Sequence, residues 1–334
     1  MPKKPLVVIT DFINDDLEPE RTALGEVADV VALDAYDEGD LAGRVEEADA
    51  VMLFHNTVIS RPTIDRLTQC KLIVRCGVGV DNVDHAYART RGLDVANVPD
   101  YGSEEVADSA IGMMLTLTRG IHQNNSRLRA APVAAEDWSY TQSAPLFRLR
   151  GRTIGILGLG RIGTATALRA KALGMDVVFY DPFKPDGYDK ALGIRRAESI
   201  EELLPQCFVL SLHSPSTEQT RGIINAATIA QMPAASYLIN TARGAIVDTS
   251  AIPAAIASGQ LAGAAIDVLA TEPPSDNDPL LTAWRDPAHP AHHRVIVNPH
   301  AAFYSEEGLR DMRVKGAAAC RRAILGEPVR TVIN

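Results

Sequence analysis

A glycine-rich segment, Gly158-Leu159-Gly160-Arg161-Ile162-Gly163, constrains the fold more than any other feature of this chain. The apolar residues 153–157 before it predict a strand. Residues 161–173 after it predict a helix, which Gly174 can end in the left-handed conformation. A second predicted strand finishes at Asp181, 181 − 163 = 18 residues beyond the last glycine. Together these features are the fingerprint of a Rossmann dinucleotide-binding unit.

Each glycine of this fingerprint has a distinct physical role. Gly158 permits the tight turn, Gly160 lets a pyrophosphate approach the backbone, and Gly163 lets the helix pack closely on the strand. The helix N-terminus offers N–H donors and a partial positive charge to the phosphates. Asp181 would bind the adenosine ribose hydroxyls and repel a 2′-phosphate, which favours NAD over NADP. Lys184 lies three residues further on and leaves NADP open.

Short apolar runs alternate with amphipathic stretches along the rest of the chain, which is typical of βαβ units around parallel sheets. A length of 334 residues predicts two domains. The chain is therefore predicted to be an α/β protein with two parallel sheets. Strands are predicted at residues 6–10, 30–34, 50–54, 72–75, 93–97, 153–157, 176–180, 208–212, 237–240, 263–266 and 295–298.

One long helix is predicted from Ser103 to Arg119, with Ser103 as its N-terminal cap. Hinges between the two domains are expected near residues 99–102 and 299–302, where prolines interrupt the pattern. A last helix at about residues 305–325 would return to the first domain.

Charge and composition exclude several classes of partner. The chain has 33 basic and 42 acidic residues and a net charge of −9, which argues against a nucleic-acid or anionic-membrane surface. It has no run of 18 apolar residues and no signal-peptide pattern. Its four cysteines lie far apart without metal-ligand spacing, and we interpret them as buried thiols. We expect a cytoplasmic protein without a metal site.

Three polar residues follow the predicted strands at the edge where ligands bind in open α/β sheets. They are Arg243, Glu272 and His300. Arg243 would hold a substrate carboxylate or carbonyl, and His300 would give a proton to an oxygen as hydride reaches the neighbouring carbon. Glu272 would orient His300 and favour its protonated form. A cation, a carboxylate and an imidazole are the set that reduction of a 2-oxo acid requires.

Each of the three has a plainer alternative. Arg243 is also compatible with a surface turn, Glu272 with an exposed loop, and His300 with a structural hydrogen bond. Their coincidence at one sheet edge favours a site. His289, His292 and His293 lack a carboxylate at metal-ligand spacing and are interpreted as a solvated loop.

With these residues in place, the chain resembles the D-isomer-specific 2-hydroxyacid dehydrogenases along nearly its whole length. Within that family it is most similar to the C-terminal-binding-protein branch. The resemblance is carried by RCGVGVDNVD (75–84), NVPDYGSEEVADSAIG (97–112), GRTIGILGLGRIG (151–163), FYDPF (179–183), INTARGAIVD (239–248), AAIDVLATEPP (264–274) and NPHAAFYSEE (298–307).

The resemblance implies a Rossmann NAD-binding domain at residues 101–302. It also implies a discontinuous, flavodoxin-like substrate domain at 1–100 plus 303–334, and a homodimer formed through the long helix. It implies Arg243, Glu272 and His300 as the catalytic residues. The implied NAD contacts are Val78, Gly158, Gly160, Arg161, Ile162, Gly163, Asp181, His213, Ser214, Pro215, Thr220, Thr241, Ala242, Arg243, Asp267 and His300. The implied substrate contacts are Phe54, Arg75, Gly77, Val78, Gly79 and Phe303.

Two departures from that branch bear on the substrate. Phe303 stands where the branch has a tryptophan, and Phe54 stands where it has a tyrosine. Both leave an apolar aromatic wall, so we expect a 2-oxo acid with an apolar or aromatic side chain. Two alternatives stay open: an NADH-sensing, corepressor-like dimer with weak dehydrogenase activity, and an NADP-dependent glyoxylate or hydroxypyruvate reductase.

Overall fold

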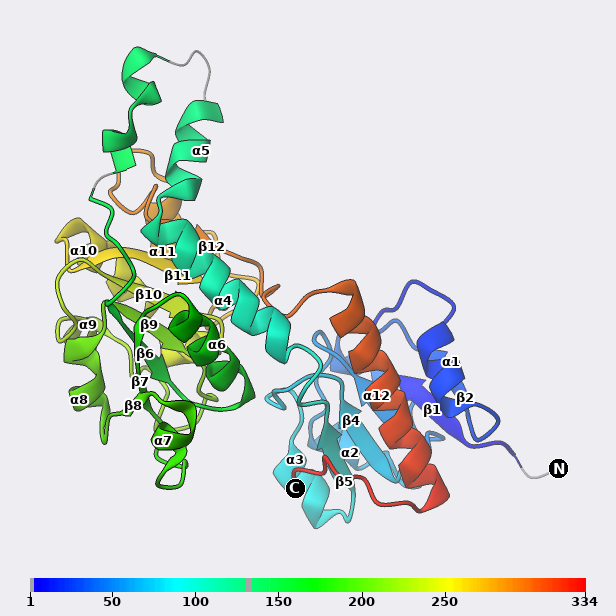
Figure 1. The fold of residues 1–334 in the computed structure, drawn as a ribbon. Helices are drawn as coiled ribbons and strands as arrows, with labels where there is room; N and C mark the ends of the chain where they lie inside the picture. Colours follow the sequence, from blue (N-terminus) through cyan, green and yellow to red (C-terminus); the bar gives the residue numbers. More distant parts are fainter. Residues whose placement is uncertain (1–2, 130–133, 144) are drawn as a thin grey trace. The chain divides into compact units, whose positions relative to one another are not determined.

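The computed structural model describes residues 3–129, 134–143 and 145–334. The chain divides into two compact units, each described here by itself. Unit 1 comprises Met1–Gly102 and Ser305–Asn334, and unit 2 comprises Ser103–Tyr304. Parallel strands with helices between them build both units, so the protein is of the α/β class (Figure 1).

Unit 1 contains a five-stranded parallel sheet in the order β2-β1-β3-β4-β5. Its strands are β1 (Leu6–Ile9), β2 (Asp29–Ala32), β3 (Ala50–Leu53), β4 (Leu72–Arg75) and β5 (Asp94–Asn97). Its helices are α1 (Glu18–Leu24), α2 (Arg61–Ile64), α3 (His85–Thr90), α12 (Glu306–Leu325) and the 3₁₀ helix η1 (Glu38–Leu41). The last residues of the chain form an antiparallel bridge between Val332 and Ala96 beside the edge strand β5.

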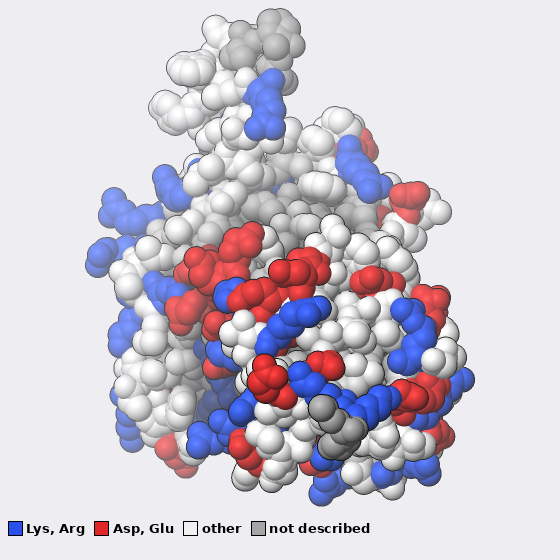
Figure 2. Space-filling model, turned by 90° about the vertical axis from the view of Figure 1, so that its right-hand side faces the viewer, with Lys and Arg blue, Asp and Glu red and all other residues white. Residues whose placement is uncertain are grey.

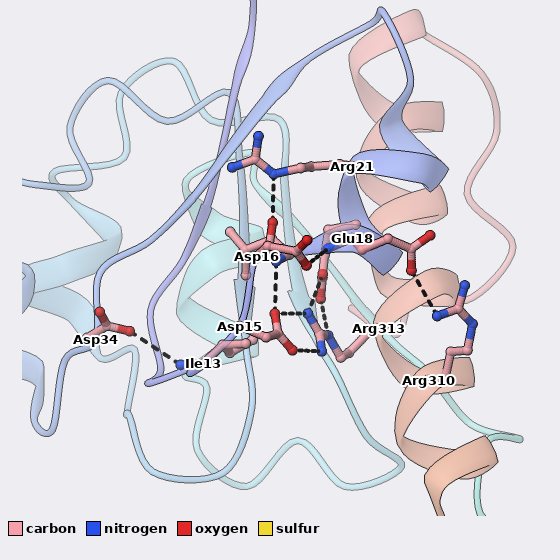
Figure 3. Close-up of polar contacts among 10 residues, drawn as sticks. Ile13, Asp15, Asp16, Glu18, Arg21, Asp34, Arg310 and Arg313 are labelled. Atoms are coloured by element: carbon pink, nitrogen blue, oxygen red, sulfur yellow. Dashed lines mark hydrogen bonds and ion pairs between the residues drawn. The ribbon is translucent and has the colours of Figure 1, made fainter.

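Helix α12 is held against α1 by a buried ion pair (Figure 3). The side chain of Arg313 is 9% exposed, and Glu20 beside it is fully buried. The Arg313 guanidinium donates to both oxygens of Glu20, at 2.6 and 2.7 Å, and to both oxygens of Asp15, at 2.5 and 2.9 Å. These bidentate contacts join residues almost 300 positions apart and fix the last helix to α1 and the residues just before it.

Unit 2 contains a seven-stranded parallel sheet in the order β12-β11-β10-β9-β6-β7-β8. Its strands are β6 (Thr153–Leu157), β7 (Asp176–Tyr180), β8 (Arg195–Arg196), β9 (Val209–Leu212), β10 (Ser236–Asn240), β11 (Leu261–Ile266) and β12 (Val295–Val297). Its α-helices are α4 (Ser103–Thr118), α5 (Ile121–Arg129), α6 (Arg161–Ala172), α7 (Tyr188–Leu192), α8 (Ile200–Leu203), α9 (Ala226–Ile229), α10 (Ile252–Ala257) and α11 (Pro279–Arg285). The 3₁₀ helices are η2 (Ala135–Trp138), η3 (Tyr140–Ser143), η4 (Leu204–Gln206), η5 (Gly244–Ile246) and η6 (Thr249–Ala251).

Apolar side chains cover both faces of the unit 2 sheet. One core cluster joins α4 and α6 to the strands, with Met114 and Ala167 fully or almost fully buried. A second cluster joins α8, α10 and α11 to the opposite side, and it includes Leu203, Ile252 and Leu280. A sheet covered on both faces leaves its strand ends as the place where polar side chains can gather.

All eleven predicted strands are present, with ends displaced by at most two residues. The two-residue strand β8 was not predicted, because so short a segment carries no periodic signal. The long helix α4 was predicted to within a residue, but the predicted cap is wrong. Ser103 is itself the first residue of the helix, and its Oγ is buried without a hydrogen-bond partner in the described part of the chain. The last helix begins after Ser305, whose hydroxyl accepts from the Gly308 amide at 2.8 Å.

Side chains of both charge signs are interspersed on the face that Figure 2 shows, with acidic ones gathered near its centre. None of the helices within the described ranges combines the length and the apolar character needed to cross a bilayer. Three of the four cysteines are buried as predicted, whereas Cys70 is only partly buried.

Candidate functional site

The glycine loop after β6 is shaped by close backbone approaches. At Gly158 φ is +90°, and a Cβ there would stand 2.7 Å from the Ser214 amide nitrogen. A Cβ at Gly163 would stand 2.1 Å from the Gly158 carbonyl oxygen. At Gly160, by contrast, a Cβ would meet nothing within 4 Å. Two glycines therefore close the turn and pack the helix, while the third faces open space at the N-terminus of α6, where a pyrophosphate can approach.

Asp181 at the end of β7 is tied to the same loop. Its Oδ2 accepts from the Leu159 amide at 2.8 Å, and its Oδ1 accepts from the Phe183 amide at 3.0 Å. Each oxygen keeps a second lone pair for a ribose hydroxyl. Lys184 turns toward the ring of Tyr188, with Nζ 5.0 Å from its centroid.

Three buried polar atoms without a partner among the described residues follow β9 and β10. They are His213 Nδ1, Ser214 Oγ and Thr241 Oγ1. Burial lowers the pKa of His213 to about 3, so the imidazole is neutral near pH 7, and its Nε2 lies 2.9 Å from Ser211 Oγ. Buried polar groups in native proteins nearly always have partners, so these atoms fit a dinucleotide lying across the strand ends. The loop that continues from them is closed by Thr220, whose hydroxyl donates to the Pro215 carbonyl at 2.7 Å.

Glu272 and His300 lie together in unit 2. His300 Nδ1 is 2.7 Å from Glu272 Oε2, and the other oxygen of Glu272 accepts from the Leu269 amide at 2.7 Å. His300 has a φ of +51°, a rare conformation for a residue with a side chain, and its amide donates to the Asp267 carbonyl at 2.7 Å. The ring of Phe303 meets the His300 ring edge to face, with centroids 6.3 Å apart.

The strained turn around His300 is held by Asp267 at the end of β11. One oxygen of Asp267 accepts from Asn298 Nδ2 at 2.7 Å and from the amides of Ala301 and Ala302 at 2.9 and 3.1 Å. Backbone strain of this kind persists only where surrounding contacts determine it. A side chain predicted only as a cofactor contact therefore also holds the turn that carries His300.

Arg243 follows β10 and is placed by Asn240, the buried last residue of that strand. Asn240 accepts from the Ala242 amide and donates to the Arg243 carbonyl, both at 3.0 Å. Arg243 Nη1 donates to the Ala242 carbonyl at 2.8 Å. A Cβ on Gly244 would stand 1.9 Å from the Leu269 carbonyl carbon, so this turn packs directly on the loop that carries Glu272.

The substrate residues implied for unit 1 lie at the carboxyl ends of the adjacent strands β3 and β4. Phe54 follows β3, and Arg75 ends β4. The Arg75 guanidinium lies against the backbone of Gly77, where φ is +151° and a Cβ would stand 1.4 Å from Arg75 Nη1. Val78, which follows Gly77, is held by Asn97, whose Nδ2 donates to the Val78 carbonyl at 2.8 Å. Gly79 completes this turn.

Comparison with known proteins assigns the family. The model of the "D-isomer specific 2-hydroxyacid dehydrogenase, NAD binding domain" matches residues 111–302. A D-3-phosphoglycerate dehydrogenase of Methanocaldococcus jannaschii is 33% identical over 328 residues, which is 98% of this chain and 59% of the relative. The chain belongs to the D-isomer-specific 2-hydroxyacid dehydrogenase family. Residues 111–302 are its NAD-binding domain.

Other proteins similar to this chain have names that state different functions. C-terminal-binding protein 1 of Caenorhabditis elegans is 32% identical over 97% of this chain and 44% of its own length. The chain thus spans about half the length of these curated relatives. The solved D-lactate dehydrogenase of Aquifex aeolicus, complexed with NAD and lactic acid, is 28% identical, with a TM-score of 0.84 and 96% of each chain covered.

Several residues of the candidate site were not found from sequence. His55, Asn240 and Asn298 each contact an implied site residue. Their signal was position alone, since each ends or follows a strand at the ligand edge. Of the three histidines in the predicted solvated loop, His293 is exposed. His289 and His292 are hydrogen bonded: His289 Nδ1 accepts from the Ala291 amide at 3.0 Å, and His292 Nδ1 lies 2.7 Å from the Trp284 carbonyl.

Proposed function

We propose that the protein is an NAD-dependent oxidoreductase that interconverts a 2-oxo acid and the D-2-hydroxy acid. The observation that carries this proposal is the 2.7 Å contact of His300 Nδ1 with Glu272, in the same unit as the glycine loop. With Nδ1–H held by the carboxylate, Nε2–H of the protonated imidazole donates a proton to the oxo oxygen. The reduced nicotinamide, when bound, supplies the hydride.

Binding and orientation of the substrate fall to charged and backbone donors. We assign the carboxylate or carbonyl contact to Arg243, whose backbone Asn240 holds in place. In unit 1 the backbone N–H groups around Gly77–Gly79 would receive the substrate carboxylate, with Arg75 beside them. Unit 1 is then the substrate domain and unit 2 the cofactor domain.

The substrate class we propose is a 2-oxo acid with an apolar or aromatic side chain. Support comes from Phe303, which packs edge to face on His300, and from Phe54 at the end of β3. Neither ring offers a hydrogen bond to a second carboxylate.

The test is NADH oxidation, followed at the absorbance of the reduced nicotinamide, against glyoxylate, hydroxypyruvate, phenylpyruvate, 4-methylthio-2-oxobutyrate and oxaloacetate. We expect fastest turnover of phenylpyruvate or the methylthio acid. We expect loss of about 10²–10⁴-fold in kcat in His300→Ala. A preference for oxaloacetate would contradict the substrate class. Turnover by His300→Ala equal to wild type would contradict the mechanism.

A second candidate function is an NADH-sensing dimer that recruits partner proteins, favoured by the similarity to C-terminal-binding protein 1. A sensor requires the dinucleotide site but not a proton donor. Slow, unselective turnover combined with tight NADH binding would favour this function over the dehydrogenase.

We also propose that the protein forms a homodimer, through the long helix α4 and the segment that follows it. Helix α5 exposes Ile121 by 56% and Leu128 by 36%, and the 3₁₀ helices packed beside it expose Trp138 by 78% and Tyr140 by 90%. Large apolar side chains gathered on one projecting segment mark an association surface. Light scattering after size exclusion should give a dimer mass for the wild type and a monomer for Ile121→Lys.

A further inference from the structure

The carboxylate of Asp11, at the carboxyl end of β1, is the centre of a buried hydrogen-bond cluster in unit 1. Asp11 is 2% exposed. Its Oδ2 accepts from the Phe54 amide and from the hydroxyls of Thr10 and Thr57, each at 2.8 Å. Its Oδ1 accepts from the amides of Asn56 at 2.9 Å and Thr57 at 3.4 Å. Four of these five hydrogen bonds come from the loop of residues 54–57.

The opposite side of that loop is held by Asn82. Its Nδ2 donates to the carbonyls of Phe54 at 3.1 Å and Thr57 at 2.8 Å. The Asn82 carbonyl accepts from the Ile59 amide at 2.9 Å, which anchors Asn82 itself. Loop 54–57 is therefore fixed by one acceptor group and one donor group from two different elements.

His55, within the same loop, connects it to Arg75 at the end of β4. His55 Nδ1 lies 3.3 Å from Arg75 Nη2, and the Arg75 guanidinium in turn lies against Gly77. Since a guanidinium only donates, His55 Nδ1 is the acceptor of this contact. A path of direct contacts thus runs from Asp11 through loop 54–57 to Arg75.

Burial by itself would raise the pKa of Asp11. Hydrogen bonds from Phe54, Thr57, Asn56 and Thr10 outweigh burial and hold the pKa of this carboxyl below its ordinary value. Asp11 is therefore a carboxylate at neutral pH and acts as an acceptor for every group around it. Such a group has no role in proton transfer, but it fixes the positions of the groups that donate hydrogen bonds to it.

We infer that Asp11 is a positioning residue for substrate binding, which sets loop 54–57 and, through His55, the guanidinium of Arg75. This inference rests on the proposed function, because it assigns Phe54 and Arg75 to the substrate site. Asp11 touches neither substrate nor cofactor in this role. Its effect is on the geometry of the groups that do.

The decisive variant is Asp11→Asn, which keeps the shape but replaces one acceptor oxygen with a donor. In one orientation of the new amide its NH₂ faces the Phe54 N–H, and in the other it faces the N–H groups of Asn56 and Thr57, so at least one backbone donor loses its acceptor. We expect the KM for the preferred 2-oxo acid to rise about 10- to 100-fold. The dissociation constant of NADH, measured by fluorescence titration, should stay within about twofold, because the cofactor domain is untouched.

Glu38→Gln is the matched control. Glu38 is a partly buried carboxylate of unit 1 that also accepts from an amide and two hydroxyls, but its donors are Ser60 and Thr63, which lie outside loop 54–57. Its pKa is likewise held low by those hydrogen bonds, against the effect of burial. We expect a lower melting temperature and an unchanged KM. A KM rise shared equally by both variants would mean general loosening of unit 1 and would overturn the inference.

The remaining outcomes also decide. If folded Asp11→Asn keeps the wild-type KM while the wild type reduces 2-oxo acids, the inference is wrong and the proposed function stands. If the wild type reduces none of them, both are wrong. If Asp11→Asn does not fold, Asn82→Asp takes its place and must raise the KM in the same way. His55→Phe tests the last step and should raise the KM without changing NADH binding.

Discussion

The two units build the same kind of parallel sheet but organise their strand ends in different ways. In unit 2 the site residues lie close together in sequence: Gly158, Gly160 and Gly163 stand within six residues. An added Cβ would collide with backbone atoms at Gly158 and Gly163 and would meet nothing within 4 Å at Gly160. In unit 1, Asp11 and Arg75 act on groups 20 to 46 positions away. A dinucleotide-type loop is therefore recognisable in the sequence as a short local motif. A site whose loops are ordered by buried hydrogen bonds involves polar residues that are scattered along the sequence.

The contrast extends to how each unit is held together. Unit 1 closes with α12, drawn from the far end of the chain and attached by the buried pair of Arg313 with Glu20. Apolar clusters stabilise both units, one around Val51 and Ile73 in unit 1 and two on the two faces of the unit 2 sheet. A buried ion pair is geometrically specific but costly to break, so the two units should fail differently when mutated.

Arg313→Met should have the largest effect on stability, because it leaves Glu20 buried without its cation. We expect a loss of about 3–5 kcal/mol in the free energy of unfolding of unit 1. Urea unfolding followed by circular dichroism measures it. Arg310→Met is the control, since the pair of Arg310 with Glu18 is exposed and should matter little. Equal losses in the two variants would remove the distinction between buried and exposed pairs.

Gly163→Ala and Gly160→Ala should separate folding from cofactor binding in unit 2. At Gly163 the added Cβ would stand 2.1 Å from a backbone oxygen, so both the melting temperature and NADH binding should fall. At Gly160 the Cβ meets no protein atom, so the fold should survive while NADH affinity drops by about 100-fold. NADH binding unchanged in Gly160→Ala would place the pyrophosphate elsewhere.

Asp181→Asn should relax the choice between the two dinucleotides. Its charge opposes a 2′-phosphate, so we expect the ratio of kcat/KM for NADPH to that for NADH to rise about tenfold. Asp186→Asn removes the same charge from an exposed neighbouring position and should leave the ratio unchanged. A rise in both variants would indicate a general electrostatic effect rather than contact with the ribose.

His213 should make unit 2 acid-sensitive. Its folded pKa of about 3 lies below the ordinary value of 6.5. The unfolded chain therefore takes up a proton below pH 6.5 that the folded chain refuses, and stability falls as the pH drops from 6.5 toward 3. His213→Gln, which can keep the contact with Ser211, should lose about 1 kcal/mol less than wild type between pH 7.5 and 5.5. Parallel losses would show that another group dominates.

The strands, the long helices and the glycine loop were predictable because each has a local signature. Alternating apolar runs placed all eleven predicted strands, and the spacing from Gly163 to Asp181 identified the dinucleotide unit. The cap of α4 was mispredicted because a serine before two acidic residues looks the same whether it precedes the helix or starts it. Asp11, Asn240 and Asn298 escaped prediction because a buried polar residue is recognisable only by its partners.

The sequence by itself determined the fold class, the family and the identity of Arg243, Glu272 and His300 as candidates, since these follow from motifs and from strand ends read along the chain. Tertiary structure decided how those side chains are held. His300 has a φ of +51°. Its 2.7 Å contact with Glu272 and the path from Asp11 to Arg75 join segments that are distant in sequence. Hydrogen-bond geometry depends on distances of a few tenths of an ångström, and only the packed chain sets those.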